Sequence, residues 1–162
     1  MKLAILYHSE SGHTKAAAAF VQEGMEQVEN VTVQAIDIKD AVPEDMDGVC
    51  GVAIGAPTYY AQVSWQMLQF LETTKLPLAD KLGCAFSTAN VNQGGSELVL
   101  QNINTVMLAK GMTVYSGGTS HGKPFTHVGA NAFAVDGGIE GHAEVLRALG
   151  KKFAEKAVQY FG

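Results

Sequence analysis

Hydrophobic residues along the chain follow two different spacings, which predict strands alternating with helices. Wholly apolar runs typical of buried strands cover residues 3–7, 49–54 and 82–86. Two further strands are expected at residues 31–38, where apolar residues alternate, and at residues 112–115. Because the central runs are apolar without alternation, they indicate a parallel sheet that is covered by helices on both faces.

Apolar residues spaced three and four positions apart predict four amphipathic helices between these strands. The predicted helices cover residues 14–28, 64–71, 96–108 and 142–161. In the second of them, Trp65, Leu68 and Leu71 share one face. Residues 116–141 show no clear period and hold seven glycines, so we expect a loop there, near the active face.

The composition is that of one folded domain, which we expect to span residues 1–162. Hydrophobic residues make up 47% of the chain and charged residues 17%, which allows a sizeable core and excludes a disordered chain. The net charge of −5 excludes a general nucleic-acid-binding protein, which needs a basic face. It leaves a small phosphate ligand open, because backbone N–H groups bind phosphate without a cationic side chain.

Hydropathy and cysteine usage favour the cytoplasm. The chain has no stretch of about 20 apolar residues, so no membrane span is expected, and it opens without the pattern of a signal peptide. Cys50 and Cys84 lie in apolar stretches, with no CxxC motif and no histidine at metal-ligand spacing. We interpret both as buried free thiols and expect no metal site.

A ligand is expected where the parallel strands end, because open doubly wound sheets bind ligands at the carboxyl ends of their strands. The loop after the first strand holds Ser9, Ser11, Gly12 and Thr14 and leads directly into a helix. Its hydroxyls and the first N–H groups of that helix predict a cradle for a terminal phosphate. The loop matches neither the GxxxxGK[ST] nor the GxGxxG motif. An ordinary helix cap is the alternative interpretation.

The loops after the third and fourth strands supply an aromatic pair and a small polar surface. Residues 55–62 contain Pro57, which stiffens the turn, and Tyr59 and Tyr60, whose rings can cover a flat ligand. Residues 87–95 are small, polar and rich in glycine, so their backbone groups can approach the polar edge of such a ring. Each loop alone also fits an ordinary surface segment. Together, the three loops predict a site for a flat ring that carries a phosphate.

Three segments carry a resemblance to a known family: SESGHT at residues 9–14, GAPTYY at residues 55–60 and STANVNQGG at residues 87–95. They resemble the phosphate loop and the two ring-binding loops of the flavodoxin-like proteins that bind flavin mononucleotide (FMN). Within these proteins the chain is most similar to the tryptophan-repressor-binding-protein family of NAD(P)H:quinone oxidoreductases, whose late GGTxxG stretch resembles residues 117–122. The resemblance implies an α/β, flavodoxin-like, three-layer doubly wound fold with a five-stranded parallel sheet in the order 2-1-3-4-5.

The resemblance also implies FMN as the cofactor and assigns residues to its parts. The phosphate would be held by Ser9, Ser11, Gly12, His13 and Thr14. The isoalloxazine ring would be lined by Pro57, Thr58, Tyr59 and Tyr60. Its pyrimidine edge and the ribityl side would contact Ser87, Thr88, Ala89, Gly94 and Gly95. No residue of the chain is indicated as an obligatory catalytic acid or base.

The chain departs from the quinone oxidoreductases at two places. Tyr115 and Ser116 run directly into Gly117, whereas that family has an extra segment there that is associated with tetramer formation. Ala109 and Lys110 stand where the family carries a pair of histidines near the flavin. The resemblance therefore leaves both the tetramer and the quinone-reductase activity in question. The loop after the fourth strand also lacks the aromatic residue that flavodoxins stack on the flavin.

Three functions fit these features. The first is an FMN-dependent oxidoreductase that takes a hydride from NAD(P)H and reduces a quinone or another small acceptor, and the open loops of small residues favour it. The alternative is a flavodoxin-type electron carrier that docks with redox partner proteins. The third is a module that keeps the fold without catalysis. The sequence does not identify the acceptor or distinguish NADH from NADPH.

Some residues keep two interpretations each. Trp65 either packs within the monomer or forms a homodimer interface. His121 and His127 either have no role, or one of them supplies a proton near the flavin. A cluster of acidic residues either caps the loop around residue 43 or forms a docking patch for a basic partner. The cluster consists of Asp37, Asp40, Glu44, Asp45 and Asp47.

Overall fold

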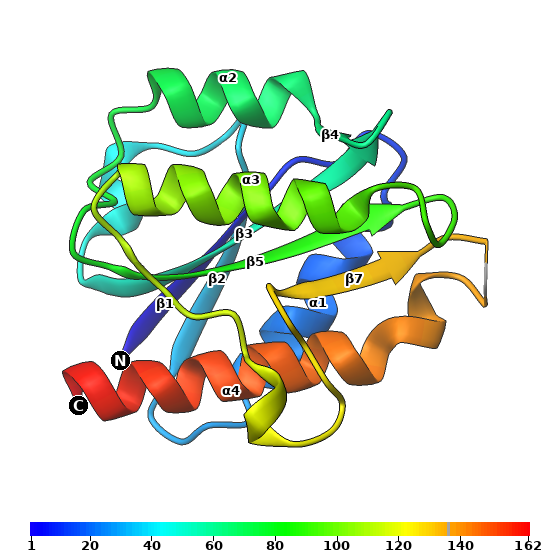
Figure 1. The fold of residues 1–162 in the computed structure, drawn as a ribbon. Helices are drawn as coiled ribbons and strands as arrows, with labels where there is room; N and C mark the ends of the chain where they lie inside the picture. The colour runs from blue at the N-terminus through cyan, green and yellow to red at the C-terminus, as the bar shows by residue number, and fades with distance from the viewer. Residues whose placement is uncertain (136) are drawn as a thin grey trace.

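The chain forms one sheet between two layers of helices in a computed structural model that describes residues 1–135 and 137–162 (Figure 1). Its long strands are parallel: β1 (Lys2–Tyr7), β2 (Thr32–Asp37), β3 (Val49–Tyr59) and β5 (Leu82–Ala89). They stand in the order β2-β1-β3-β5, followed by β6 (Thr113–Val114). Since β4 (Gln62–Val63) is a short antiparallel partner of the end of β3, this order confirms the expected arrangement 2-1-3-4-5.

Two short strands share the fifth position of the sheet. The first, β6, pairs with the start of β5, and β7 (Ala130–Phe133) pairs in parallel with the end of β5. The prediction of a loop throughout residues 116–141 was therefore wrong for β7. The sequence of β7 is ANAF, and its two buried residues are alanines, so it carries little hydrophobic signal. The single strand expected at residues 112–115 forms over two residues only.

The central strands extend further toward the site than expected. Their pairing continues to Pro57 of β3 and Thr88 of β5, so the loops predicted to begin at residues 55 and 87 begin later. Pairing between β1 and β3 ends at Gly55, which leaves Pro57 with a strand neighbour on the β5 side only. A proline is tolerated at such an edge-like position. Gly55 and Pro57, which are typical of turns, therefore take part in strand pairing here because the segment is buried.

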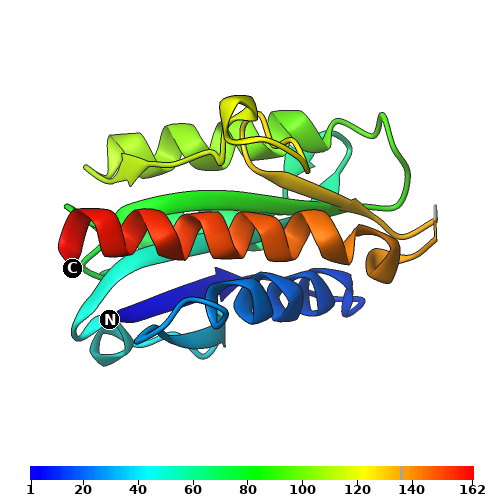
Figure 2. The ribbon, with the colours of Figure 1, turned by 90° about the horizontal axis from the view of Figure 1, so that it is seen from below.

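Helices cover both faces of the sheet (Figures 1 and 2). One face carries α1 (His13–Met25) and α4 (Ala143–Phe161), and the other carries α2 (Trp65–Thr73) and α3 (Ser96–Ala109). Three short 3-10 helices lie in the connections: η1 (Pro43–Met46), η2 (Thr119–His121) and η3 (Ile139–His142). None of the helices among the described residues is both long and apolar enough to cross a bilayer.

The sheet separates two apolar cores. Phe86 and Phe153 are fully buried in the core against α1 and α4, and Ile54, Met67 and Leu100 lie in the core against α2 and α3. Burial of both sheet faces explains why the central strands are apolar at nearly every position. Both thiols are free, as expected from the sequence, but only Cys84 is fully buried, whereas Cys50 is half-buried.

The face of α2 predicted from the sequence was wrong. Met67 and Leu71 are buried, whereas Trp65 is 66% exposed and Leu68 also reaches the surface. The helix is short, and one turn carries apolar residues on both sides, so the periodicity did not single out one face. Of the two interpretations of Trp65, the structure excludes burial within the monomer.

Candidate functional site

The three loops identified in the sequence meet at one edge of the sheet. They follow β1, β3 and β5, whose carboxyl ends lie side by side because these strands are parallel neighbours. Thr14 Oγ1 in α1 and Thr88 Oγ1 at the end of β5 are 2.8 Å apart, and both side chains are buried. This contact fixes the start of α1 directly against the end of β5.

The loop after β1 leaves several backbone N–H groups without an acceptor. Gly12 caps α1 with a φ of 90°, and its carbonyl accepts the N–H of Ala16 at 2.9 Å. The N–H groups of Gly12, His13 and Thr14 have no acceptor among the described residues, and a Cβ on Gly12 would meet nothing within 4 Å. Unpaired N–H groups at a helix start can hold an anion.

Side chains of the same loop support this backbone arrangement. Ser9 Oγ accepts the N–H of Lys15 at 3.2 Å, and Ser11 Oγ lies 3.2 Å from His13 Nδ1. The one acidic residue of the loop, Glu10, accepts a hydrogen bond from Gln66 Nε2 of α2 at 2.6 Å. Its carboxylate is thereby tied to α2. These contacts connect the loop to both helix layers.

The aromatic pair lies on a hairpin that β3 and β4 form. Thr58 pairs with Val63 and Tyr59 with Gln62, which leaves Tyr60 and Ala61 as the two turn residues. Their φ angles are 50° and 61°, as in a type I′ turn, where Asn and Gly are the usual residues. Each non-glycine residue in this conformation costs about 1 kcal/mol. Strain of this kind at a ligand-facing turn is typical of functional sites.

The two tyrosines differ in exposure. The side chain of Tyr60 is fully exposed at 101%, whereas that of Tyr59 is 40% exposed. Partial burial raises the pKa of Tyr59, and the nearby Glu10 carboxylate raises it further. Tyr59 thus stays a neutral hydroxyl at the edge of the phosphate loop. A large aromatic ring held out in water gains nothing from the fold, so Tyr60 is available for a ligand or a partner.

Thr58 carries a polar atom that the protein does not satisfy. Its Oγ1 is buried and has no hydrogen-bond partner among the described residues. Such a group costs about 1–3 kcal/mol unless a ligand or water pairs with it. Because Thr58 lies next to the two tyrosines, this hydroxyl fits a ligand with polar groups beside a flat ring.

The loop after β5 closes the site from the other side. Gly95 caps α3 with a φ of 86°, and a Cβ there would lie 2.3 Å from the Cβ of Ala61. The hairpin tip and the start of α3 therefore touch only because residue 95 is glycine. Gly94, half-buried, precedes it, and Ala89 is the last residue of β5.

Two hydroxyls predicted for the cofactor are already engaged within the protein. Ser87 Oγ donates to Asn131 Oδ1 of β7, and Thr88 Oγ1 is paired with Thr14. Asn131 Nδ2 in turn donates to Glu97 Oε1 of α3 at 3.2 Å. This network was missed in the sequence because Asn131 lies in the segment interpreted as a loop. Its role is to hold β5, β7 and α3 together beside the site.

The two late histidines lie away from the phosphate loop and the tyrosine hairpin. His121 in η2 packs its ring edge against Tyr115 at 6.1 Å, beside Lys152 and Lys156 of α4. His127 lines a pocket beside β7, together with Phe125 and with Asn92 of the loop after β5. Neither residue makes a contact with the phosphate loop or the tyrosine hairpin that would give it a role in proton transfer there.

Comparison with known proteins gives a consistent result. Residues 4–115 match the family described as the flavodoxin domain. A flavodoxin from Clostridium saccharobutylicum is 38% identical over 162 residues, covering 99% of this chain and all of the relative. An NAD(P)H dehydrogenase (quinone) from Chromohalobacter salexigens is 26% identical, with 99% of both chains covered. The crystal structure of a WrbA-like flavodoxin from Agrobacterium tumefaciens superposes with a TM-score of 0.78, at 25% identity and with 98% of both chains covered.

Proposed function

We propose that this chain, which belongs to the flavodoxin family, is an FMN-dependent oxidoreductase that uses NAD(P)H to reduce a quinone or another small acceptor. The observation that carries the proposal is the convergence of unpaired N–H groups, an unpaired threonine hydroxyl and an exposed tyrosine on one edge of the sheet. They match the phosphate, the polar edge and the flat ring of FMN. When bound, FMN supplies the chemistry of hydride acceptance and electron transfer.

The phosphate would lie at the start of α1. The N–H groups of Gly12, His13 and Thr14 would donate to its oxygens, with the hydroxyls of Ser9 and Ser11 alongside. The positive end of the helix dipole favours the negative charge there without a cationic side chain. The phosphate-binding residues predicted from the sequence therefore remain our proposal for this part of the site.

The isoalloxazine ring would lie between the tyrosine hairpin and the loop after β5. Tyr59 and Tyr60 would contact the ring, Thr58 would pair with its polar edge or the ribityl chain, and backbone groups of Gly94 and Gly95 would approach the pyrimidine edge. Pro57 is the last residue of β3 that pairs with β5, and Ala89 ends β5, so both lie where the strands position these groups. Ser87 and Thr88 would act through the strand backbone, because their hydroxyls hold the loops together.

Enzymatic activity is favoured by the open side of this site. Residues 90–95 contain no aromatic side chain, so the ring would be covered by tyrosine from the hairpin and left accessible elsewhere. A second substrate needs such access in order to approach the flavin. A quinone or a small acceptor and the nicotinamide would then use the same open face in turn.

An electron carrier is the second candidate, and the 38% identity to a flavodoxin favours it. Trp65 and Leu68 are exposed on α2 directly after the hairpin, where a redox partner protein could pack. The two functions differ in whether NAD(P)H alone reduces the bound flavin.

A spectroscopic experiment separates these functions. The purified protein is titrated with FMN, freed of excess flavin, and mixed with NADH or NADPH without oxygen. We expect the flavin absorption bands to bleach rapidly with one of the two nucleotides. Bleaching with dithionite alone would contradict the enzyme and favour the carrier, and failure to bind FMN would overturn the cofactor.

A pair of threonine variants tests the placement of FMN. Thr58→Val removes the unpaired buried hydroxyl of the site, and we expect FMN affinity to fall about tenfold while the flavin-free protein keeps its stability. Thr126→Val is the matched control, since Thr126 Oγ1 is also buried without a partner among the described residues but lies beside Gly117. Equal FMN affinities in the two variants would show that the Thr58 hydroxyl does not contact FMN.

A further inference from the structure

A groove with two lobes runs along the side of the phosphate loop that faces β2, next to the proposed flavin site. One lobe, of about 320 Å³, lies between the end of β2 and α2. The other, of about 460 Å³, lies on the α1 side of β2. Ser9, Asp37 and Lys39 line both lobes, so the two lie next to each other at the end of β2. Each lobe has the size of a small-molecule site.

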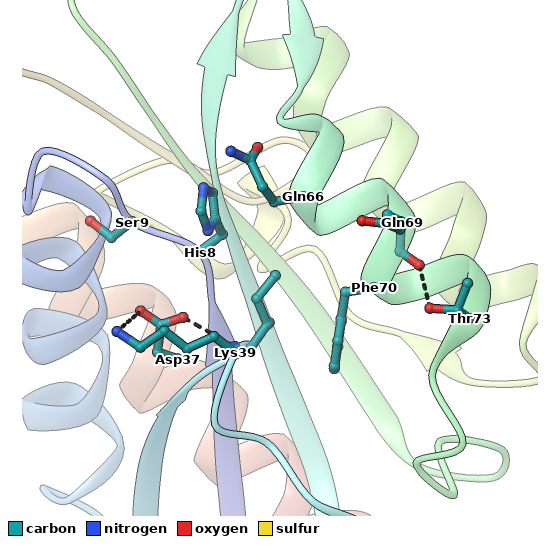
Figure 3. A pocket seen from close by; sticks show the side chains of 9 residues that line it. His8, Ser9, Asp37, Lys39, Gln66, Gln69, Phe70 and Thr73 are labelled. Carbon is teal, nitrogen blue, oxygen red and sulfur yellow. Dashed lines mark hydrogen bonds and ion pairs between the residues drawn. The ribbon is translucent and has the colours of Figure 1, made fainter.

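The first lobe combines apolar walls with unsatisfied polar atoms (Figure 3). Phe70 of α2 points into it from one side and Asp37 and Lys39 lie on the other, while His8 and Gln66 lie at one end. His8 Nε2 and Gln66 Oε1 are buried without a hydrogen-bond partner among the described residues. The nearest anion to His8 Nε2 is Glu10 Oε1 at 3.8 Å, which is beyond hydrogen-bonding distance.

These walls fit a flat heteroaromatic ring with both donors and acceptors on its rim. The ring would lie against Phe70 and Ile38, and its rim would pair with the imidazole nitrogen and the amide oxygen that the protein leaves unpaired. Adenine has this chemistry, because its amino group donates and its ring nitrogens accept.

Asp37 occupies the position that suits a ribose. It ends β2, its side chain is largely buried, and its Oδ1 accepts the N–H of Lys39 at 3.2 Å. A carboxylate at the end of the second strand of a doubly wound sheet binds ribose hydroxyls in dinucleotide sites. Lys39 Nζ, 3.5 Å from Asp37 Oδ2, and Lys15 in the second lobe supply cations for phosphates next to that ribose.

We propose that this groove binds the adenosine phosphate end of a dinucleotide, with adenine against Phe70 and the ribose on Asp37. The inference rests on the proposed function for the identity of the ligand, since NAD(P)H would place its nicotinamide at the flavin and its adenosine in this groove. Asp37 would contact the ribose and Asp40 lines the second lobe, so a 2′-phosphate on the ribose would meet negative charge, while Lys15 and Lys39 would pair with the other phosphates of the dinucleotide. The groove therefore selects NADH over NADPH.

The test uses ADP-ribose, which lacks the nicotinamide and so reports binding without electron transfer. Calorimetric titration of the FMN-loaded protein should show binding, and 2′-phospho-ADP-ribose should bind about tenfold more weakly. Phe70→Ala should weaken ADP-ribose about tenfold, and Asp37→Asn should narrow the difference between the two ligands. Phe125→Ala, at an exposed phenylalanine outside the groove, is the control. FMN affinity should be unchanged in all three variants.

Two results would overturn the proposal: no binding of ADP-ribose, or binding that neither Phe70→Ala nor Asp37→Asn alters. The same titration on flavin-free protein separates this proposal from the proposed function, because the groove can bind ADP-ribose even where FMN or NADH reduction fails. A comparison of FAD with FMN identifies the source of the adenosine. If ADP-ribose binds to FMN-saturated protein, the adenosine that the groove accepts belongs to the nicotinamide dinucleotide. If FAD binds more tightly than FMN and Phe70→Ala removes this difference, the adenosine belongs to the flavin.

Discussion

Individual hydroxyl groups decide how the loops of the site are joined. Thr14 Oγ1 and Thr88 Oγ1 are each other's hydrogen-bond partner, and both side chains are almost completely buried. Two buried hydroxyls that pair cost little, whereas one that has lost its partner costs about 1–3 kcal/mol. The stability of the start of α1 against β5 therefore depends on both residues together.

We predict that Thr14→Val or Thr88→Val alone lowers the free energy of unfolding by about 1–3 kcal/mol, because each leaves the other hydroxyl buried and unpaired. The double variant should lose less than the sum of the two, since it removes both polar groups and keeps the shape. Urea unfolding of the flavin-free proteins gives all four free energies. Additive losses would mean that the two hydroxyls do not depend on each other.

At this scale the sequence predicts residue types better than their contacts. The hydroxyls, glycines and tyrosines on the three loops could be found because strand ends of a parallel sheet must meet. The partner of Ser87 could not, because Asn131 stands 44 positions away in a strand without a hydrophobic pattern. The same holds for Gly95, whose contact with Ala61 depends on how the hairpin turns.

The β3–β4 hairpin carries backbone strain that a binding role would explain. Its turn residues, Tyr60 and Ala61, both have left-handed φ angles, although the type I′ turn favours Asn and Gly. The Tyr60 ring makes up for none of this strain, because it is fully exposed. A ligand that packs on the ring gives the reason for keeping it there.

Tyr60→Asn should therefore stabilise the flavin-free protein by about 0.5–1 kcal/mol, because Asn adopts the left-handed conformation more readily. The same change should lower FMN affinity about tenfold through the loss of ring contact. Thermal unfolding and fluorescence titration measure the two effects. Tyr160→Asn, at an exposed tyrosine near the end of α4, is the control and should leave FMN affinity unchanged. If both variants bound FMN more weakly, the loss of affinity could not be assigned to the ring of Tyr60 on the hairpin.

Helices and strands differ in how well the hydrophobic periodicity of the sequence predicts them. The long strands and α4 were found because their patterns extend over several turns or consecutive apolar positions. The face of α2 and the existence of β7 were not, since one is nine residues long and the other four. In short elements the choice of face depends on packing against neighbours, which no local pattern contains.

At the scale of the whole molecule, layer order follows from rules that need little sequence detail. Alternating strands and helices with right-handed crossovers place helices on both faces, and the resemblance adds the strand order, which the sheet confirms. The split of the fifth strand between β6 and β7 does not follow from these rules. It depends on residues 115–129 leaving the edge of the sheet and returning to it.

The fold as a whole also sets how stability responds to alkali. Burial raises the pKa of Cys84 far above its ordinary value of 9.0 and also raises the pKa of Cys50 above that value. It raises the pKa values of Tyr7, Tyr59 and Tyr115 above 10.0. Above these ordinary values the unfolded chain releases protons that the folded chain keeps. The unfolded state then binds fewer protons, so the free energy of unfolding falls as pH rises.

We predict that this loss begins near pH 9 and amounts to about 1 kcal/mol for the thiol of Cys84 between pH 9 and 10, where Cys50 also contributes and before the tyrosines add to it. Below about pH 8 the thiol is protonated in both states, and its contribution stays constant. Cys84→Ala removes the titrating thiol, so the free energy of unfolding of this variant should fall less steeply with pH over this interval. The smaller side chain lowers that free energy by the same amount at every pH. Urea unfolding at half-unit steps from pH 7.5 to about 10 compares the two slopes, and parallel curves would show that the buried thiol does not govern the alkaline response.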